Sequence, residues 1–422
     1  MPADAEMKMS PGHWPQRRRH YGRRFGAWLA ALRSISSPWA IVTGVSTRTE
    51  THPPPGRSDS SAQAHPTGRE RRPLTVVDVA LRGGPGYDGL GTYLRAKQRY
   101  AEQTPELIHH TIVPGVRESH SAGWHELPPA WRPLAREDRF TGRSQRLLEL
   151  LGSLRADAIM LHGPFDTAQR AIEVARFSGA RTVAVPHHAE PAPTAGLARA
   201  RRWWPERREQ QALRRVDAVI APAAADASPR STAVRLGVDP EFQADPSARR
   251  GREVVFAGEL SPSAHVGALL LAANYPNMLW PLRIIGHGRQ GRALQRAIGM
   301  YGLGHRVEIE PFITDRARLA AIFARAGCVV NPGEPGRCQL VMLEAAATGA
   351  PIVAPEGAPI ATIAPSLTHT FPDRGIPALA EAIQCALGAR PDPHLGARLA
   401  QENTWERAFA RELEDLRAML AG

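Results

Sequence analysis

Two stretches of the chain place polar side chains directly after short apolar runs. The run at residues 181–185 is followed by Pro-His-His-Ala-Glu at residues 186–190, and the run at residues 328–331 by a polar loop that reaches residue 339. Parallel α/β sheets bind ligands beyond the carboxyl ends of their strands. We therefore expect His188, as a catalytic candidate, and His187 beside it to contact a sugar or an acceptor hydroxyl. A structural histidine pair is the alternative.

Residues 331–354, NPGEPGRCQLVMLEAAATGAPIVA, follow the pattern of a strand end, a polar loop, a helix and a small turn into another strand. The loop before the helix at residues 340–347 leaves backbone N–H groups free at the positive end of the helix dipole, which suits a diphosphate. Glu344 lies one turn into this helix, and a carboxylate can accept hydrogen bonds from two ribose hydroxyls. A solvated helix glutamate is the alternative.

Two glycine-rich turns each separate an expected strand from an expected helix. The first contains Gly83, Gly84, Gly86, Gly89 and Gly91, and the second contains Gly286 and Gly288 followed by Arg289. Glycine lets a ligand approach the backbone closely, and N–H groups at a helix start favour phosphate or sugar hydroxyls. The first turn matches neither a dinucleotide fingerprint nor a Walker loop. A purely structural turn, and a surface role for Arg289, are the alternatives.

Short apolar runs alternate with helical patterns along both halves of the chain. In the first half the runs are at residues 74–81, 108–113, 158–161, 181–185 and 218–221, and in the second half at residues 253–257, 282–285, 307–309, 328–331 and 351–354. This alternation predicts an α/β fold with two doubly wound, Rossmann-like parallel sheets in tandem. We expect domains at residues 73–247 and 248–395, followed by a closing helical segment at residues 396–422.

The basic charge of the chain is concentrated at its N-terminus. The chain has 422 residues and a formal charge of +12, of which residues 1–72 contribute +7. Their arginine run and their Pro, Ser, Thr and Gly content predict a disordered tail. A solvated tail and a peripheral contact with acidic lipid are both open interpretations. The remainder is only mildly basic, so we expect no nucleic-acid partner.

Three cysteines occur, Cys328, Cys338 and Cys385, without a CxxC pair or metal-ligand spacing. Neither a disulfide framework nor a metal cofactor is therefore expected. The apolar runs are shorter than the roughly 20 residues that a membrane span requires. These features predict a cytoplasmic protein, with the inner face of the membrane as a site of peripheral contact.

These segments resemble the family 4 glycosyltransferases, retaining enzymes of the GT-B fold, and especially bacterial members with a GG..TYL..K loop. The loop is matched at residues 83–97, including Thr92, Tyr93, Leu94 and Lys97. The histidine pair, the turn at residues 256–260 and the Trp405-Glu406 helix also resemble family features. The most specific match is NPGE followed by LVMLEAAATGAPIVA.

The resemblance implies two Rossmann-like domains facing across a cleft, with a nucleoside diphosphate sugar bound as donor to the second. Glu344 would hold the ribose, and backbone N–H groups at Gln339, Leu340 and Val341 the diphosphate, beside the turns at Gly258, Gly286 and Gly288. A glycan or lipid-linked acceptor would approach loops of the first domain that contain Gly84, Gly91, Thr92 and His187. The departing diphosphate would help to deprotonate the acceptor hydroxyl, and the last helix would pack back toward the first domain.

Three positions depart from the family pattern. Gly336 stands where the family has a sugar-contacting acid, Glu259 where it has an arginine and Ala264 where it has a lysine. Glu334 is the candidate catalytic replacement for the acid, and Arg337, Arg289 and His265 are candidate replacements for the cations. A GT-B protein that binds sugar nucleotides or serves a polysaccharide pathway as a non-catalytic partner is the main alternative. A sugar-nucleotide epimerase is a third interpretation.

Overall fold

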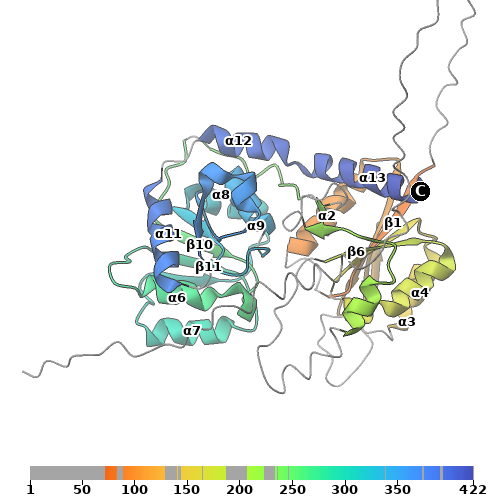
Figure 1. Cartoon of the computed structure of the whole chain (residues 1–422), viewed down its shortest axis with the longest axis horizontal. Helices are drawn as coiled ribbons and strands as arrows, with labels where there is room; N and C mark the ends of the chain where they lie inside the picture. The colour runs from red at the N-terminus through yellow and green to blue at the C-terminus, as the bar shows by residue number, and fades with distance from the viewer. Residues whose placement is uncertain are drawn as a thin grey trace, which may run out of the picture. The chain divides into compact units, whose positions relative to one another are not determined.

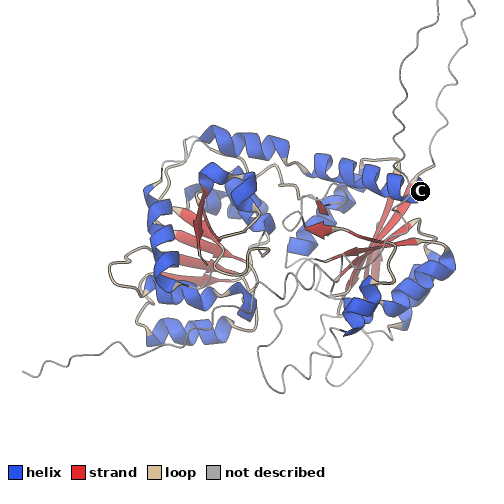
Figure 2. Ribbon diagram, viewed as in Figure 1, coloured by secondary structure: helices blue, strands red, loops and turns tan. Residues whose placement is uncertain are grey.

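Two parallel sheets organise the chain in the computed structural model (Figures 1 and 2). The structure describes residues 72–82, 89–128, 140, 144–163, 165–186, 207–222, 233–234, 236–245, 247–337, 339–372, 375–389 and 393–421. These ranges belong to a single contact-defined unit that runs from Glu70 to Gly422. The expectation for the N-terminal tail concerns residues that lie almost entirely outside them.

The first sheet has seven strands in the order β3-β4-β2-β1-β5-β6-β7. All neighbours pair in parallel except β3 and β4, which form an antiparallel edge. The strands are β1 (Leu74–Ala80), β2 (Leu107–Pro114), β3 (Ser119–Ser121), β4 (Trp124–Leu127), β5 (Ala158–His162), β6 (Arg181–Val185) and β7 (Ala218–Val219). The central strands are almost continuously apolar because helices cover both faces of the sheet.

The helices that accompany the first sheet come from distant parts of the chain. They are α2 (Gly89–Glu102), α3 (Gln145–Ser153), η1 (Phe165–Thr167), α4 (Gln169–Ser178), a helical segment at residues 207–213 and α13 (Trp405–Ala421). The last helix packs against α2, and its Leu413 and Leu416 share a buried cluster with Leu74 and Val76 of β1. The core of the first domain therefore includes the last helix of the chain.

The second sheet has six parallel strands in the order β12-β11-β10-β13-β14-β15. This is the doubly wound order: the first three strands along the chain extend the sheet to one side, and the strand order reverses at the fourth, which pairs with the other side of the first. The strands are β10 (Val254–Ala257), β11 (Leu282–Ile285), β12 (Val307–Glu310), β13 (Cys328–Val330), β14 (Ile352–Pro355) and β15 (Thr368–Phe371), and a short pair β8 (Ala221–Pro222) and β9 (Ala233–Val234) precedes them.

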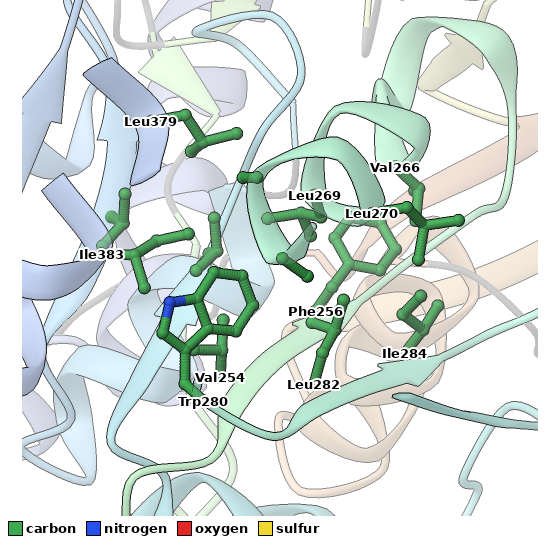
Figure 3. Packing of buried hydrophobic residues seen from close by; sticks show 14 of the residues in the cluster. Val254, Phe256, Val266, Leu269, Leu270, Trp280, Leu282, Ile284, Leu379 and Ile383 are labelled. Carbon is green, nitrogen blue, oxygen red and sulfur yellow. The ribbon is translucent and has the colours of Figure 1, made fainter. Parts of the chain in front are cut away.

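Helices cover both faces of this sheet (Figure 1). One face packs on α6 (Val266–Ala273), α7 (Gly291–Met300) and α11 (Ile376–Gly388). The other face packs on α8 (Arg316–Arg325), α9 (Gln339–Ala347), α10 (Ile360–Ile363) and α12 (Pro393–Glu402). Two short 3-10 turns, η2 (Pro262–Ala264) and η3 (Pro365–Leu367), complete the domain. Figure 3 shows the first face, where Trp280 and Phe256 pack among Leu269, Leu270 and Ile383. The predicted two-sheet α/β fold is confirmed.

A group of charged side chains is buried inside the first domain. The Asp78 carboxylate on β1 lies 2.7 Å from the Lys97 ammonium, and His109 Nε2 and His162 Nε2 each lie 2.6 Å from its oxygens. Lys97 also lies 2.6 Å from Glu412 of α13, which accepts a hydrogen bond from the Tyr93 hydroxyl. We call these six side chains the Asp78 network. It fixes α2 and α13 to the sheet.

Candidate active site

Two loops meet at the carboxyl edge of the second sheet. Residues 258–265 follow β10 and residues 331–337 follow β13, and the two strands are neighbours in the sheet. A Cβ atom on Gly333 would lie 2.7 Å from the carbonyl oxygen of Ser263, so the two backbones are in direct contact and only glycine fits there. Side chains of the two loops can therefore act on the same ligand.

Arg337 joins the two loops. Its Nη1 lies 2.6 Å from the Ser263 hydroxyl, and its Nη2 lies 3.2 Å from the Ser261 hydroxyl and 3.3 Å from Glu259 Oε2. Only 9% of the Arg337 side chain is exposed, whereas 46% of the Glu259 side chain is. The result is a buried guanidinium held by two hydroxyls and one half-exposed carboxylate.

Asn331 shapes the loop that carries Arg337. Its buried side-chain amide donates to the backbone carbonyls of Glu334 and Arg337, and its oxygen accepts from the N–H of Gly333. The Arg337 N–H donates to the same Glu334 carbonyl, at 3.0 Å. The turn that presents the guanidinium is therefore set by a side chain at the end of β13. Glu334 is half-buried, and its backbone takes part in this turn.

The structure pairs Glu259, which departs from the family pattern, with Arg337, which is a candidate replacement for a missing cation. The resemblance places an arginine at position 259 and an acid at position 336, and the chain instead has Glu259 and, one residue after Gly336, Arg337. These two side chains form an ion pair across the loops. Ala264 is buried beside them and supplies no charge. One positive and one negative charge are thus still present, but their loops are exchanged: the acid, Glu259, lies in the loop after β10 and the cation, Arg337, in the loop after β13.

The second glycine turn runs alongside the first loop. The N–H groups of Gly258 and Leu260 donate to the carbonyls of Ile285 and His287. Gly286 has φ +151°, and a Cβ atom there would overlap the carbonyl oxygen of Gly258. Backbone packing is therefore enough to require this glycine. Gly288 lies against Leu260 in the same way, while Arg289 extends from this turn into solvent.

Helix α9 begins two residues after Arg337. The Gln339 side chain donates to the Gly336 carbonyl at 3.1 Å, and Leu340 packs in a cluster that includes Tyr93, Leu94 and Trp405. Val341 is partly buried. The side chains of these three residues therefore have structural contacts, and their backbone N–H groups remain the candidates for a phosphate.

Glu344 is buried in α9 instead of exposed, with only 1% of its side chain accessible. It forms an ion pair with Arg316, whose Nε also lies 2.8 Å from Asp239. Burial raises the pKa of Glu344 to about 7, although Arg316 acts in the opposite direction. Glu344, the carboxylate expected to hold ribose, thus has a pKa close to neutral pH, and Arg316 holds it in position.

The predicted contacts in the first domain are only partly described. Gly91 and Thr92 lie in the first turns of α2, which begins at Gly89 and not at residue 92, and Gly91 is buried. Gly84, His187 and His188 lie outside the described residues, and their expected roles stay predictions.

Sequence reasoning did not find Arg316, Asp239, Ser261 or Ser263. Arg316 is 28 residues from Glu344 and 77 from Asp239, and no local pattern connects them. Asp78 did carry a signal, since an aspartate in the middle of the apolar run LTVVDVA requires buried partners.

Two family models match the chain in succession. The model described as Glycosyltransferase Family 4 matches residues 87–228, and the model described as Glycosyl transferases group 1 matches residues 251–388. The first match covers every strand of the first sheet except β1, and the second covers all six strands of the second sheet. A search of curated protein sequences gives no significant match.

Several solved structures share the fold. Sucrose-phosphate synthase from Thermosynechococcus elongatus is 18% identical with a TM-score of 0.62, over 83% of this chain and 100% of that chain. The Anabaena protein HepE, solved in complex with UDP and glucose, is 14% identical with a TM-score of 0.57, over 81% and 99%. WaaG, a glycosyltransferase involved in lipopolysaccharide biosynthesis, is 15% identical with a TM-score of 0.55, over 81% and 98%. At these identities the likeness concerns the fold.

Within the described residues, no three His, Cys, Asp or Glu side chains gather in a way that could hold a metal ion. None of the helices in the described part of the chain has the length and apolar character needed to cross a bilayer.

Proposed function

We propose that the chain transfers a sugar from a nucleoside diphosphate sugar to an acceptor hydroxyl with retention, because a family 4 and a group 1 glycosyltransferase model match its two halves and its fold is that of GT-B structures. The acceptor is a glycan, a lipid-linked sugar or a small molecule of a polysaccharide pathway. The UDP bound to HepE supports a nucleotide as part of the donor.

One observation carries the proposal: the same loop supplies a buried guanidinium and the start of a helix. Arg337 precedes the first residue of α9 by two positions. A guanidinium can donate two hydrogen bonds to a phosphate, and free N–H groups at a helix start add donors and a favourable dipole. Both features suit the diphosphate of a sugar nucleotide. Glu344, further along α9, would accept hydrogen bonds from the ribose hydroxyls.

The proposed reaction needs no protein nucleophile. The bond between the anomeric carbon and the β-phosphate oxygen breaks, and the acceptor oxygen forms the new bond to that carbon. The acceptor proton passes to the departing diphosphate. Catalysis then depends on positioning and on stabilising the charge that develops on the leaving group. Arg337 and the N–H groups of α9 supply that stabilisation.

The pairing of Glu259 with Arg337 also favours a second candidate function. A carboxylate 3.3 Å from the guanidinium offsets part of its positive charge, and Ala264 contributes no cation. A chain with this weakened phosphate site can bind a sugar nucleotide without transferring the sugar. Binding without transfer would make it a partner protein in the same pathway.

Calorimetric titration of the full chain with UDP-, GDP- and ADP-glucose separates the two functions when release of nucleoside diphosphate is followed in the same samples. We expect saturable binding of one donor and slow turnover. Glu344→Ala should abolish the turnover. Glu308→Ala, which removes an exposed carboxylate of β12, is the control and should leave both unchanged. Binding without turnover, with or without candidate acceptors, would favour the partner protein. If no donor binds, the proposal is wrong.

Donor affinity is expected to fall as the pH is lowered through 7. A ribose hydroxyl donates best to an ionised carboxylate, and the pKa of Glu344 is about 7. Protonation of this raised-pKa group should therefore weaken binding by up to about tenfold per pH unit below that value. Glu344→Gln should remove the dependence. Calorimetry at pH 6, 7 and 8 should use a sugar nucleotide and not the nucleoside diphosphate. The terminal phosphate of a nucleoside diphosphate itself titrates at about pH 6. Equal affinity at all three pH values would contradict the ribose assignment.

A further inference from the structure

We infer that Glu259 selects the donor by accepting hydrogen bonds from the hydroxyls of its sugar, while Arg337 binds the diphosphate; this inference rests on the proposed function. The two side chains lie 3.3 Å apart across the loops that follow β10 and β13. In a sugar nucleotide the sugar is bonded directly to the β-phosphate. A phosphate bound at Arg337 therefore brings the sugar next to the Glu259 carboxylate.

The exposure of the pair suits this division of roles. The Arg337 side chain is buried and held by Ser261 and Ser263 as well as by Glu259, so its position is set by the protein. Nearly half of the Glu259 side chain faces solvent. Among the described residues, its carboxylate pairs with Arg337 alone, through Oε2. Oε1 is therefore available to accept hydrogen bonds from a ligand.

Charge gives Glu259 opposite effects on two related ligands. A carboxylate repels a nearby diphosphate and offsets part of the attraction of Arg337, so Glu259 weakens the binding of a nucleoside diphosphate. A sugar nucleotide has the same diphosphate and also hydroxyls that donate to the carboxylate, and hydrogen bonds to a charged group are the stronger kind. Glu259 thus disfavours the nucleotide alone and favours the nucleotide that carries a sugar.

The experiment compares these two ligands on wild-type full chain and on Glu259→Gln. Calorimetry measures the Kd of UDP and of UDP-glucose, or of the GDP or ADP pair when that is the nucleotide the wild type binds. For Glu259→Gln we expect UDP to bind at least as tightly as before and UDP-glucose to bind about tenfold more weakly. Glu308→Gln, which changes an exposed carboxylate beside Arg283, should leave both values unchanged.

The ratio of the two Kd values separates the inference from a purely structural role. If Glu259 only positions Arg337, both affinities will fall together and the ratio will stay at its wild-type value, which overturns the inference alone. If the wild type binds neither ligand of any pair, the proposed function fails and the inference with it. A melting temperature of Glu259→Gln close to wild type checks that the variant is folded.

Discussion

Asp78→Ala is expected to lower the free energy of unfolding by about 3 to 5 kcal/mol, the range found when one partner of a buried ion pair is removed. Asp78 is fully buried and pairs with Lys97 while accepting hydrogen bonds from His109 and His162. Its loss leaves an ammonium in the core with Glu412 as its remaining carboxylate partner among the described residues. Urea unfolding followed by circular dichroism measures the change.

The matched control for this variant is Glu106→Ala. Glu106 also forms an ion pair with α13, through Arg417, but 57% of its side chain is exposed. Exposed pairs contribute roughly 0 to 1 kcal/mol, so the control should change little. If the two variants lose similar amounts of stability, the Asp78 network does not stabilise the first domain in the way described.

The same network gives the stability of the domain a pH dependence. Burial alone would raise the pKa of Asp78, but Lys97, His109 and His162 outweigh it and hold the pKa well below its ordinary value. A carboxyl with a depressed folded-state pKa stabilises the fold above its unfolded pKa of about 3.9. This contribution is therefore lost as the pH falls below that value and toward the folded-state pKa.

Arg337→Ala is expected to lower kcat/KM by about 10² to 10⁴, since hydrogen bonds to charged groups contribute roughly 1.5 to 3 kcal/mol each and two would be lost. The reason is that, in the proposed reaction, the diphosphate gains negative charge as the sugar leaves, and the buried guanidinium of Arg337 is proposed to bind it. Steady-state transfer with the donor identified by calorimetry measures the effect.

Two other arginines show whether this effect is specific. Arg318→Ala removes an exposed arginine that pairs with Glu310 at β12, and should leave kcat/KM unchanged. Arg289→Ala tests the other candidate cation, which extends into solvent from the neighbouring glycine turn. A large loss in Arg289→Ala together with a normal rate in Arg337→Ala would move the phosphate contact to Arg289.

The sequence was sufficient to predict both sheets because their strands are short apolar runs separated by turns and helices. Runs such as residues 282–285 and 181–185 coincide with β11 and β6. The edge strands β3 and β4 were not predicted, since SHS and WHEL carry little of the β-branched pattern. Short-range pattern thus predicts the buried strands better than the exposed edge.

The candidate site could be predicted only in part. The loop and helix at residues 331–347 are contiguous, so their spacing was visible in the sequence. The ion pair between Glu259 and Arg337 joins residues 78 positions apart, and only the packing of β10 against β13 brings them together. The burial of Glu344 was missed for the same reason, because it depends on Arg316 and on the core around α9.

The position of α13 in the first domain affects how the chain can fold as it is synthesised. Tyr93 and its partner Glu412 are 319 residues apart, so at translation rates of about 5 to 20 residues per second the partner emerges roughly 16 to 64 s later. During this interval Lys97 has Asp78 but not Glu412, and the face of β1 that Leu413 and Leu416 cover is open. The second domain is synthesised entirely within the same interval. The first domain is thus the last to complete its core, and it reaches its final stability only after α13 has been synthesised.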